Sequence, residues 1–385
     1  MRRLGLSEPR LAGVVAVLAL LPSGGAQPAV TCRNGRCVKV IYGTAPAARR
    51  LRVNAHGPVT VEGGVSRDLS YTVTVTVNAR SQSEARRVLQ QYTVRMEAQG
   101  PWAVLSAPGG AAMSTIVVKA PRLNGAVIST SDGAVQATGI EGTLDVDSGA
   151  GELTADRIGG DCKLVTGGGK IMVGHVGGSL RSATGAGTIT ARSIGGEAIL
   201  ETQGGDIVAN EAGGSIRAET GGGAVRIGSA GGTVNATSGG GEIVVEKAKG
   251  TVSVRNMAGP VQVRSAAGVR CESASGGIHV SNISGPMRVS TSMGSIMANL
   301  LGSRLTDSYL ATGSGDITVL IPSNVGVMIQ AQNNMADTLA RIVSDFREVG
   351  VRRQGPRVVA EGPVNGGGPV LQISGMGGTI FIRRQ

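Results

Sequence analysis

The chain has 385 residues and 63 glycines, and a glycine content of about 16% is more than twice the ~7% of ordinary globular proteins. Its 41% hydrophobic and 16% charged residues supply enough apolar material for a core and exclude a disordered chain. One Trp, four Tyr and two Phe are its aromatic residues, so the predicted core is thin and aliphatic, and binding by aromatic stacking is disfavoured. The formal net charge of +11 indicates an anionic partner.

The first residues have the pattern of a secretory signal peptide. Arg2, Arg3 and Arg10 precede an apolar run at 11–21, and small residues before position 27 predict cleavage after Ala26. This run is too short to cross a bilayer, which needs about 20 residues. No later segment is apolar enough to do so, and no transmembrane span is therefore expected after signal cleavage. We expect an exported protein located in the periplasm, at the cell surface or in the medium.

Export to an oxidising compartment bears on the chemical state of the first two cysteines. Cys32 and Cys37 flank Asn34-Gly35, which is a strong signal for a tight turn. Because an oxidising compartment allows disulfides to persist, this spacing favours a disulfide-linked hairpin. A metal site is a poor alternative because no His or further Cys lies nearby.

A long internal repeat dominates the chain. Glycines recur every 18 residues, with a 17-residue step to Gly125 at one end and to Gly285 at the other. Counting from each glycine, mostly apolar residues occupy positions +2, +4, +11, +13 and +16, and position +6 carries a hydroxyl group six times in succession. The regularly spaced glycines are Gly142, Gly160, Gly178, Gly196, Gly214, Gly232, Gly250 and Gly268; the hydroxyl residues are Ser148, Thr166, Thr184, Thr202, Thr220 and Ser238.

Apolar residues two positions apart indicate half-buried strands rather than helices. Each repeat is therefore interpreted as strand, glycine-rich turn, strand and second glycine-rich turn. One such unit cannot bury its own apolar side, whereas stacked units form a continuous core. The sequence predicts an all-β fold: a single-stranded β-helix, or β-solenoid, with about ten coils between Gly125 and Gly302 and a length of about 48 Å at ~4.8 Å per coil. The register separates Cys162 from Cys271 by six coils, so both are expected to be buried, free and inert.

The flanks of the repeat are less regular. One short helix is predicted between Ser81 and Tyr92, where Ser81 and Glu84 have the spacing of a capping box. Alternating apolar residues after Pro322 predict strands that complete the solenoid. The expected organisation is a signal peptide (1–26), a basic segment with the disulfide hairpin (27–50), N-terminal strands and the helix (51–123), the regular solenoid (124–322) and the C-terminal strands (323–385).

The combination of a signal peptide, one early helix and glycine-rich ladders resembles the bacterial putative-adhesin family. The closing stretch from Asn365 to Arg383, Asn-Gly-Gly-Gly-Pro-Val-Leu-Gln-Ile-Ser-Gly-Met-Gly-Gly-Thr-Ile-Phe-Ile-Arg, carries the same resemblance. It is also similar to the head domains described as putative autotransporter adhesins. The resemblance implies a right-handed β-helix and an envelope location, and it supplies no catalytic residues.

One group of carboxylates is a candidate for chemistry. Glu201 and Glu219 fall at the same outward position of neighbouring coils, and Asp206 follows across a turn. Paired carboxyl groups about 5–9 Å apart can hydrolyse glycosides, and carboxylates can bind calcium. Arg217 falls on the same face and is expected to neutralise the pair, which favours a solvated charge cluster. The three histidines lack carboxylate partners in the predicted register. No catalytic residue, metal ligand or cofactor is therefore assigned.

The charge is concentrated at the two ends of the chain. Six basic residues and no acidic residue occur between positions 27 and 61, whereas residues 62–340 are close to neutral and the stretch from Arg341 onward is basic again. An anionic envelope polymer, or a surface or periplasmic protein, is therefore expected to bind at the ends, and nucleic acid is not expected. The predicted N-terminal basic patch consists of Arg33, Arg36, Lys39, Arg49, Arg50 and Arg52.

These observations favour a non-enzymatic envelope or cell-surface adhesion or interaction module. Two alternatives stay open. One is a polysaccharide-active enzyme built on the β-helix, which requires that Glu201, Glu219 and Asp206 line a groove. The other is a structural or stress-associated periplasmic protein whose ends recruit a partner.

Overall fold

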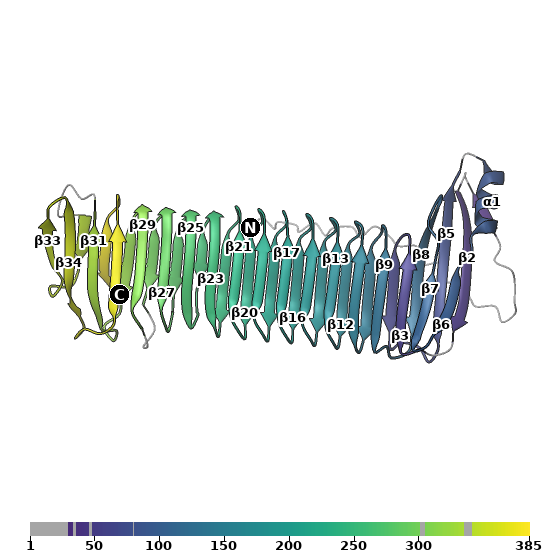
Figure 1. Ribbon diagram of the computed structural model, residues 1–385, viewed down its shortest axis with the longest axis horizontal. Helices are drawn as coiled ribbons and strands as arrows, with labels where there is room; N and C mark the ends of the chain where they lie inside the picture. Colours follow the sequence, from purple (N-terminus) through teal and green to yellow (C-terminus); the bar gives the residue numbers. More distant parts are fainter. Residues whose placement is uncertain (1–29, 34–35, 46–47, 80, 301–304, 335–340) are drawn as a thin grey trace, which may run out of the picture.

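The computed structural model describes residues 30–33, 36–45, 48–79, 81–300, 305–334 and 341–385, and the predicted signal peptide lies outside them. The fold is an all-β solenoid of about 11 turns with ~18-residue coils and one helix, which confirms the predicted fold class. Figure 1 shows an elongated rod with the helix at one end. Among the described residues, no helix combines the length and the apolar character needed to cross a membrane.

Two long sheets, called sheet A and sheet B here, run along the rod and enclose its core. Sheet A contains β1 (Val30–Arg33), β2 (Arg36–Ala45), β4 (Val59–Gly63), β5 (Leu69–Asn78), β8 (Ala112–Ala120), β10 (Val135–Ile140), β12 (Leu153–Ile158), β14 (Ile171–Val176), β16 (Ile189–Ile194), β18 (Ile207–Ala212), β20 (Val225–Ala230), β22 (Ile243–Ala248), β24 (Val261–Val263), β26 (Ile278–Ser281), β28 (Ile296–Asn299), β30 (Ile317–Ile321), β32 (Ile342–Ser344) and β36 (Ile380–Arg384).

Sheet B contains β3 (Arg50–Ala55), β6 (Arg95–Gln99), β7 (Trp102–Ser106), β9 (Gly125–Thr130), β11 (Thr143–Ser148), β13 (Cys162–Thr166), β15 (Leu180–Thr184), β17 (Ala198–Thr202), β19 (Ile216–Thr220), β21 (Val234–Ser238), β23 (Thr251–Ala258), β25 (Gly268–Ser275), β27 (Met287–Met293), β29 (Ser308–Ser314), β31 (Val327–Asn333), β33 (Gly350–Gln354), β34 (Arg357–Val364) and β35 (Val370–Gly375). The single helix, α1, spans Gln82–Gln91.

Each regular coil contributes one strand to each sheet, and the strands of neighbouring coils pair in parallel. Ile171 pairs with Ile189 in sheet A, and Leu164 pairs with Ser182 in sheet B. Alternate residues point inward, so aliphatic side chains such as Leu200 and Ile207 are fully buried between the sheets. Stacking of identical coils therefore builds the continuous aliphatic core that the repeat predicted.

The predicted column of hydroxyl groups joins successive coils at the corner that follows each strand of sheet B. Thr220 is buried, and its Oγ1 donates a hydrogen bond of 2.8 Å to the backbone oxygen of Gly205 in the preceding coil. The Oγ1 of Thr220 also accepts a hydrogen bond of 3.0 Å from the backbone N–H of Gly223, which lies in the corner that follows Thr220. Buried backbone groups need partners, and this column supplies them where the strand pairing is interrupted.

The structure contains a 17-residue coil, but not at the positions that the glycine spacing predicted. At the N-terminal end Gly125 pairs with Thr143, so the step between these coils is 18 residues. At the other end Thr251 pairs with Gly268, which places a 17-residue coil one repeat earlier than expected. A glycine next to a corner is thus not always the corner residue, because the strand register is fixed by the inward apolar side chains.

The order of coils along the rod differs from their order in the sequence at both ends. Strand β3 lies between β7 and β9, although β7 follows β3 in the chain by more than forty residues. Likewise β35 lies between β29 and β31, so the C-terminal coil is inserted between two earlier coils. Figure 1 shows this yellow coil between the green β29 and β31.

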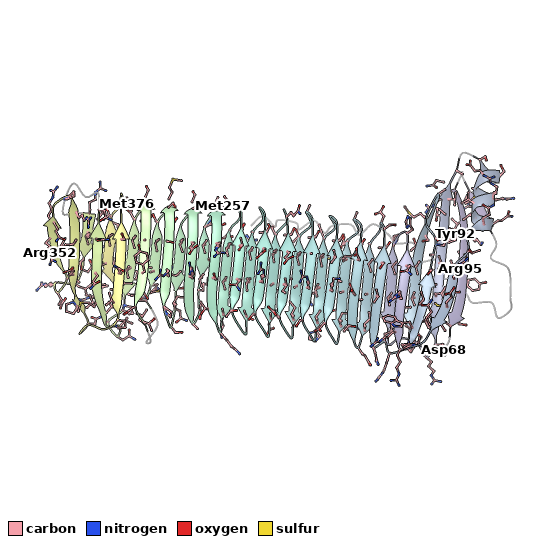
Figure 2. All side chains as sticks on the ribbon, in the orientation of Figure 1. Asp68, Tyr92, Arg95, Met257, Arg352 and Met376 are labelled. Atoms are coloured by element: carbon pink, nitrogen blue, oxygen red, sulfur yellow. A yellow bond between two sulfur atoms is a disulfide. The ribbon has the colours of Figure 1, made fainter. Side chains whose placement is uncertain are left out.

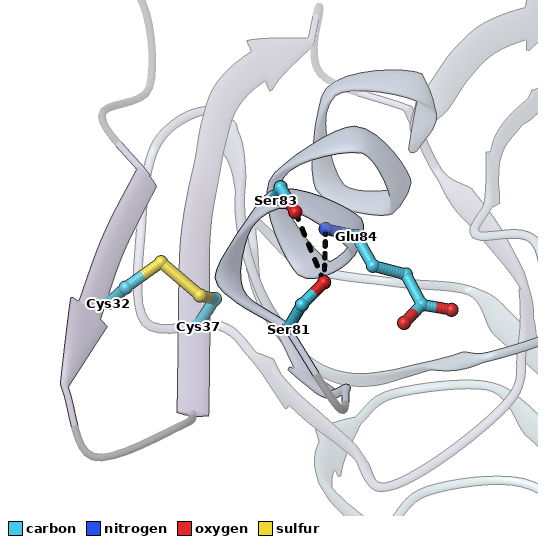
Figure 3. The surroundings of a disulfide bond; sticks show 5 residues. All are labelled: Cys32, Cys37, Ser81, Ser83 and Glu84. Atoms are coloured by element: carbon cyan, nitrogen blue, oxygen red, sulfur yellow. Dashed lines mark hydrogen bonds between the residues drawn. A yellow bond between two sulfur atoms is a disulfide. The ribbon is translucent and has the colours of Figure 1, made fainter.

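Antiparallel strands and the helix close the N-terminal end. Strand β5 pairs with both β2 and β8, and β2 pairs with β1. The side chain of Ser81 caps α1 by accepting a hydrogen bond of 3.2 Å from the backbone N–H of Glu84, as its spacing predicted. Figure 3 shows this cap near the disulfide between Cys32 and Cys37, whose sulfur atoms lie 2.07 Å apart.

The C-terminal end is closed by a second antiparallel group. Strand β34 pairs with β31 on one side and with β33 on the other. Asn365 has a positive φ of 52°, and its Nδ2 donates hydrogen bonds of 3.0 Å to the oxygen of Pro322 and 2.8 Å to that of Val325. These bonds hold the turn that leads the chain back to β35.

Candidate functional site

The six residues of the predicted basic patch do not form one surface. Arg33 and Arg36 face each other across β1 and β2 and are exposed. Lys39 is turned inward on β2, and its Nζ donates hydrogen bonds of 2.8 Å to the oxygen of Leu89 and 3.1 Å to that of Tyr92. A cation placed at the last carbonyl groups of α1 stabilises the helix end, so Lys39 has a structural role.

Of the remaining three arginines of that patch, two contact Trp102. Arg49 precedes β3, and Arg50 and Arg52 lie on the outward side of this strand. The guanidinium carbon of Arg50 lies 5.4 Å from the centre of the Trp102 ring, and that of Arg52 lies 5.0 Å from it. Trp102 is in register with Arg50 on the adjacent strand β7, which explains these cation–π contacts.

Ion pairs are distributed unevenly along the rod. Among the described residues, every pair involves residues from Arg122 onward, and none involves the N-terminal end. Twelve Lys and Arg residues but only four Asp and Glu residues occur between positions 30 and 120. The described ion pairs are Arg122–Glu141, Arg157–Asp156, Lys163–Asp145, Arg217–Glu219, Arg226–Glu242, Arg255–Glu272, Arg264–Glu246, Arg270–Glu272, Arg352–Glu361 and Arg383–Asp345.

The two basic ends therefore differ. At the C-terminal end, Arg383 lies 2.8 Å from Asp345, and this hydrogen bond holds the pKa of the Asp345 carboxyl below its usual range. Arg352 is paired with Glu361 at 2.8 Å. Positive charge at the N-terminal end has no such acidic partners among the described residues, so that end is the stronger attractor for an anionic group.

A hollow of about 760 Å³ opens beside these N-terminal arginines. It lies between β6, which is the edge strand of sheet B at this end of the rod, and the ends of β2 and β5 in sheet A. Apolar residues form much of its wall, and Arg49 and Arg95 lie at its margin. The lining residues are Thr44, Ala45, Ala48, Arg49, Tyr71, Val94, Arg95, Met96, Glu97, Ala98, Gly100, Pro101, Trp102 and Ala103. Figure 2 labels Arg95 and Tyr92 at this end of the rod.

The structure brings only part of the predicted carboxylate cluster together. Glu201 and Glu219 are directly opposite each other in β17 and β19 and line a hollow of about 650 Å³. Arg217 lies 2.6 Å from Glu219, as the shared face predicted. Asp206 is absent from the lining of that hollow, and its Oδ1 accepts a hydrogen bond of 2.8 Å from the backbone N–H of Ala224.

The histidines form no acid–base arrangement with carboxylates among the described residues. Nδ1 of His56 lies 2.6 Å from the hydroxyl of Ser131. His175 is in register with Ser193, and His279 lies between two uncharged neighbours on the outer side of sheet A. Within the described part of the chain, no group of three or more His, Cys, Asp or Glu side chains could hold a metal ion.

Cys162 and Cys271 are buried and free, which confirms the prediction from the register. Burial raises the pKa of each thiol to about 12, with smaller contributions from Asp145 to Cys162 and from Glu272 to Cys271. Because the thiolate is the reactive form, both cysteines are inert in the folded protein.

Several residues at the N-terminal hollow were not singled out by the sequence. Tyr71, Arg95 and Met96 belong to ordinary alternating segments, and their positions depend on how β2, β5 and β6 are placed. Trp102 was the one available signal: it is the single tryptophan of an aromatic-poor chain and stands at the start of a strand.

Comparisons with known proteins give structural likenesses only. No protein-family model matches the chain, and no match was found among curated proteins. A putative adhesin from Bacteroides fragilis NCTC 9343 is similar at 14% identity, with 77% of this chain and 100% of that chain covered and a TM-score of 0.29. A putative adhesin from Parabacteroides distasonis ATCC 8503 is 10% identical, with 70% and 96% covered and a TM-score of 0.30.

A putative cell adhesion protein from Clostridium sporogenes ATCC 15579 is 11% identical, with 90% and 100% covered and a TM-score of 0.20. These solved structures are of the class that the sequence resembles. At such TM-scores they assign no function to this chain, and the fold is established by the strand register described above.

Proposed function

We propose that this protein is an exported, non-enzymatic β-solenoid that acts as an interaction module of the cell envelope or cell surface. The observation that supports this function most is the contrast between the N-terminal end and the rest of the rod. Many charges along the coils and at the C-terminal end form ion pairs, such as Arg122 with Glu141 and Arg383 with Asp345, whereas the N-terminal end carries twelve basic and four acidic residues without an ion pair among the described residues.

An exposed cluster of one charge attracts the opposite charge over about one Debye length, ~8 Å at physiological ionic strength. The proposed partner is therefore anionic and binds the N-terminal end. It is either an envelope polymer or a surface or periplasmic protein. The neutral coils separate this end from the opposite end of the rod, which suits a module that presents one binding surface at a distance.

A polysaccharide-active enzyme is the second candidate, because Glu201 and Glu219 do line a hollow. The pairing of Glu219 with Arg217 and the structural hydrogen bond of Asp206 oppose it. If the purified protein releases sugar from any envelope polysaccharide and Glu201→Gln abolishes that release, the non-enzymatic proposal is wrong.

The decisive experiment combines localisation with binding. The protein is located by cell fractionation and by protease treatment of intact cells, and binding of the purified chain to isolated envelopes is then measured. We expect Arg50→Gln with Arg52→Gln to weaken binding by roughly tenfold, equivalent to about 1.4 kcal/mol. The control is Arg181→Gln with Arg192→Gln, which removes two charges from the coils. Recovery of the protein in the cytosol, or equal loss of binding in both double variants, would refute the proposal.

A further inference from the structure

The two sheets have unequal lengths at the N-terminal end. Beyond the coil formed by β7 and β8, sheet A continues through β5, β2 and β1. Sheet B continues through β6 alone in the described part of the chain. The inward side of β2 consequently faces no strand of sheet B. Figure 1 shows β2 extending past β6 at this end of the rod.

The helix covers only part of the exposed inner side of sheet A. α1 packs on β2 and β5, and its last carbonyl groups accept the hydrogen bonds from Lys39. Farther along β2, the ring of Tyr71 lies over Gly43, where an added Cβ would collide with the tyrosine hydroxyl. This part of the inner side is not covered by the helix and borders the hollow of about 760 Å³.

The residues around this hollow are core residues that remain incompletely buried. Ala103 of β7 is 3% exposed, whereas its partner Ala98 on β6 is exposed although it lies on the same inward side. The other apolar lining residues pack against the core and stay half-buried, which means that one more layer of side chains is missing there. They are Ala45, Ala48, Tyr71, Val94 and Met96.

Strand β6 is also an open sheet edge. Among the described residues it pairs only with β7, so the backbone groups on its other side have no strand partner. Its sequence, Arg-Met-Glu-Ala-Gln, contains no proline that would prevent pairing. An open edge next to a half-filled apolar hollow is the arrangement that accepts an additional strand.

We propose that β6 and the adjoining hollow form a strand-addition site for one extended, acidic segment of a partner protein. The backbone of the segment pairs with the free edge of β6. Its inward side chains fill the hollow opposite Tyr71, and its acidic side chains meet Arg95 and Arg49, which form no ion pair with any residue that the structure describes. This inference rests on the proposed function in taking the N-terminal end as the binding end, and it names the partner's chemistry.

A single strand fits this place better than a second copy of the protein. Sheet A continues past β6 through β2 and β1, and α1 packs on both, so the edge of β6 is recessed from the end of the rod. Beside the hollow, β2 is the last described strand of sheet A, because β1 pairs only with residues 36–39 of β2, so one added strand of sheet B would complete the layer there. A polysaccharide would satisfy the arginines but has no peptide groups to pair with β6. The free edge of β6 and the apolar wall of the hollow therefore favour an extended peptide.

The chain provides its own reporter for the test. Trp102 is its single tryptophan and lines the hollow. The probe is an acetylated, amidated heptapeptide in which Val and Asp alternate. We expect it to change the fluorescence of Trp102 with a micromolar Kd, near −8 kcal/mol, and to slow hydrogen exchange at residues 95–99. A matched peptide with N-methylated amides keeps the side chains and loses the pairing groups, so it should not bind.

Two variants test the two halves of the site. Ala98→Phe fills the hollow, and Arg95→Glu reverses the marginal charge; each should weaken peptide binding by at least roughly tenfold. Arg192→Glu is the matched charge reversal on the coils and should leave binding unchanged. Far-ultraviolet circular dichroism and Tm establish that the variants remain folded. The exposed position of Arg95 keeps the test informative if Ala98→Phe does not fold.

The outcomes separate this inference from the proposed function. Equal binding of the N-methylated peptide, or no protection of β6, overturns strand addition. Binding of alginate, an anionic polysaccharide, without binding of the peptide also overturns it but leaves the envelope function standing. A concentration-dependent dimer that Ala98→Phe abolishes would show that a second copy occupies the edge. A cytosolic location combined with peptide binding would refute only the proposed function.

Discussion

The Nζ of Lys39 donates a 2.8 Å hydrogen bond to the backbone oxygen of Leu89, fifty residues farther along the chain. This bond joins the inward side of β2 to the C-terminal end of α1 and holds the helix against sheet A. A residue that the sequence placed in a surface patch therefore anchors the N-terminal end of the rod.

Replacing Lys39 by Met should loosen α1. The variant removes two hydrogen bonds to helix carbonyl groups, and a bond from a charged donor contributes about 1.5–3 kcal/mol. We expect faster hydrogen exchange in residues 82–91 and little change in the coils. Arg36→Met, on the outward side of the same strand, is the control. Unchanged exchange in α1 would contradict the anchoring role.

Replacing Thr220 by Val should destabilise the solenoid by about 1–3 kcal/mol, because the backbone groups of Gly205 and Gly223 lose their partner. Chemical denaturation measures this change in the free energy of unfolding. Thr237→Val makes the same chemical change at an exposed position and should have little effect. Equal effects at the two sites would show that the hydroxyl column is dispensable.

Two neighbouring glycines should respond differently to alanine. A Cβ added at Gly205 would collide with the backbone oxygen of Gly187, whereas one added at Gly204 would meet nothing within 4 Å. We expect Gly205→Ala to lower the Tm and Gly204→Ala to leave it unchanged or raise it slightly, since alanine restricts the unfolded chain. A similar loss of Tm in both variants would refute close packing of the corners.

The buried thiols should make stability fall at alkaline pH. Each thiol has a pKa of about 12 in the folded protein, against a reference value of 9.0. Between these values the unfolded chain has lost the proton that the folded protein keeps, so the free energy of unfolding decreases as the pH rises from 9 to 12. Cys271→Val should reduce this slope in urea denaturation at several pH values. An unchanged slope would argue against burial of the thiol.

The repeat was predictable because its causes are local. Spacing of two within each strand and glycine at each corner fix an 18-residue coil, and the same spacing placed Cys162 and Cys271 inside. Ser81 and Glu84 likewise predicted the start of α1. The spacing of the glycines did not predict every corner residue. Gly268 lies one residue after the corner position, because the packing of inward side chains, rather than glycine, sets the register.

The ends were not predictable in the same way. The strands at Arg50–Ala55 and Trp102–Ser106 alternate like many others, and nothing in either specifies that they become neighbours. The hollow beside β6 depends on that pairing and on the different lengths of the two sheets. The inward direction of Lys39 follows from the same arrangement. Long-range pairing therefore determines the candidate site, whereas local spacing determines the rod.

The inserted coils at both ends have a consequence for the order of folding. Coils within the rod contact neighbours one repeat away, so they can assemble progressively as in other repeat proteins. In contrast, the strands at the two ends pair with strands far away in the sequence. Arg50 pairs with Gly125, and Ser308 pairs with Leu371. Closing these long loops costs more entropy and is slower. The middle of the chain should therefore fold first, and a chain interrupted before Val370 would have an unfinished C-terminal end, because β35 would be missing between β29 and β31.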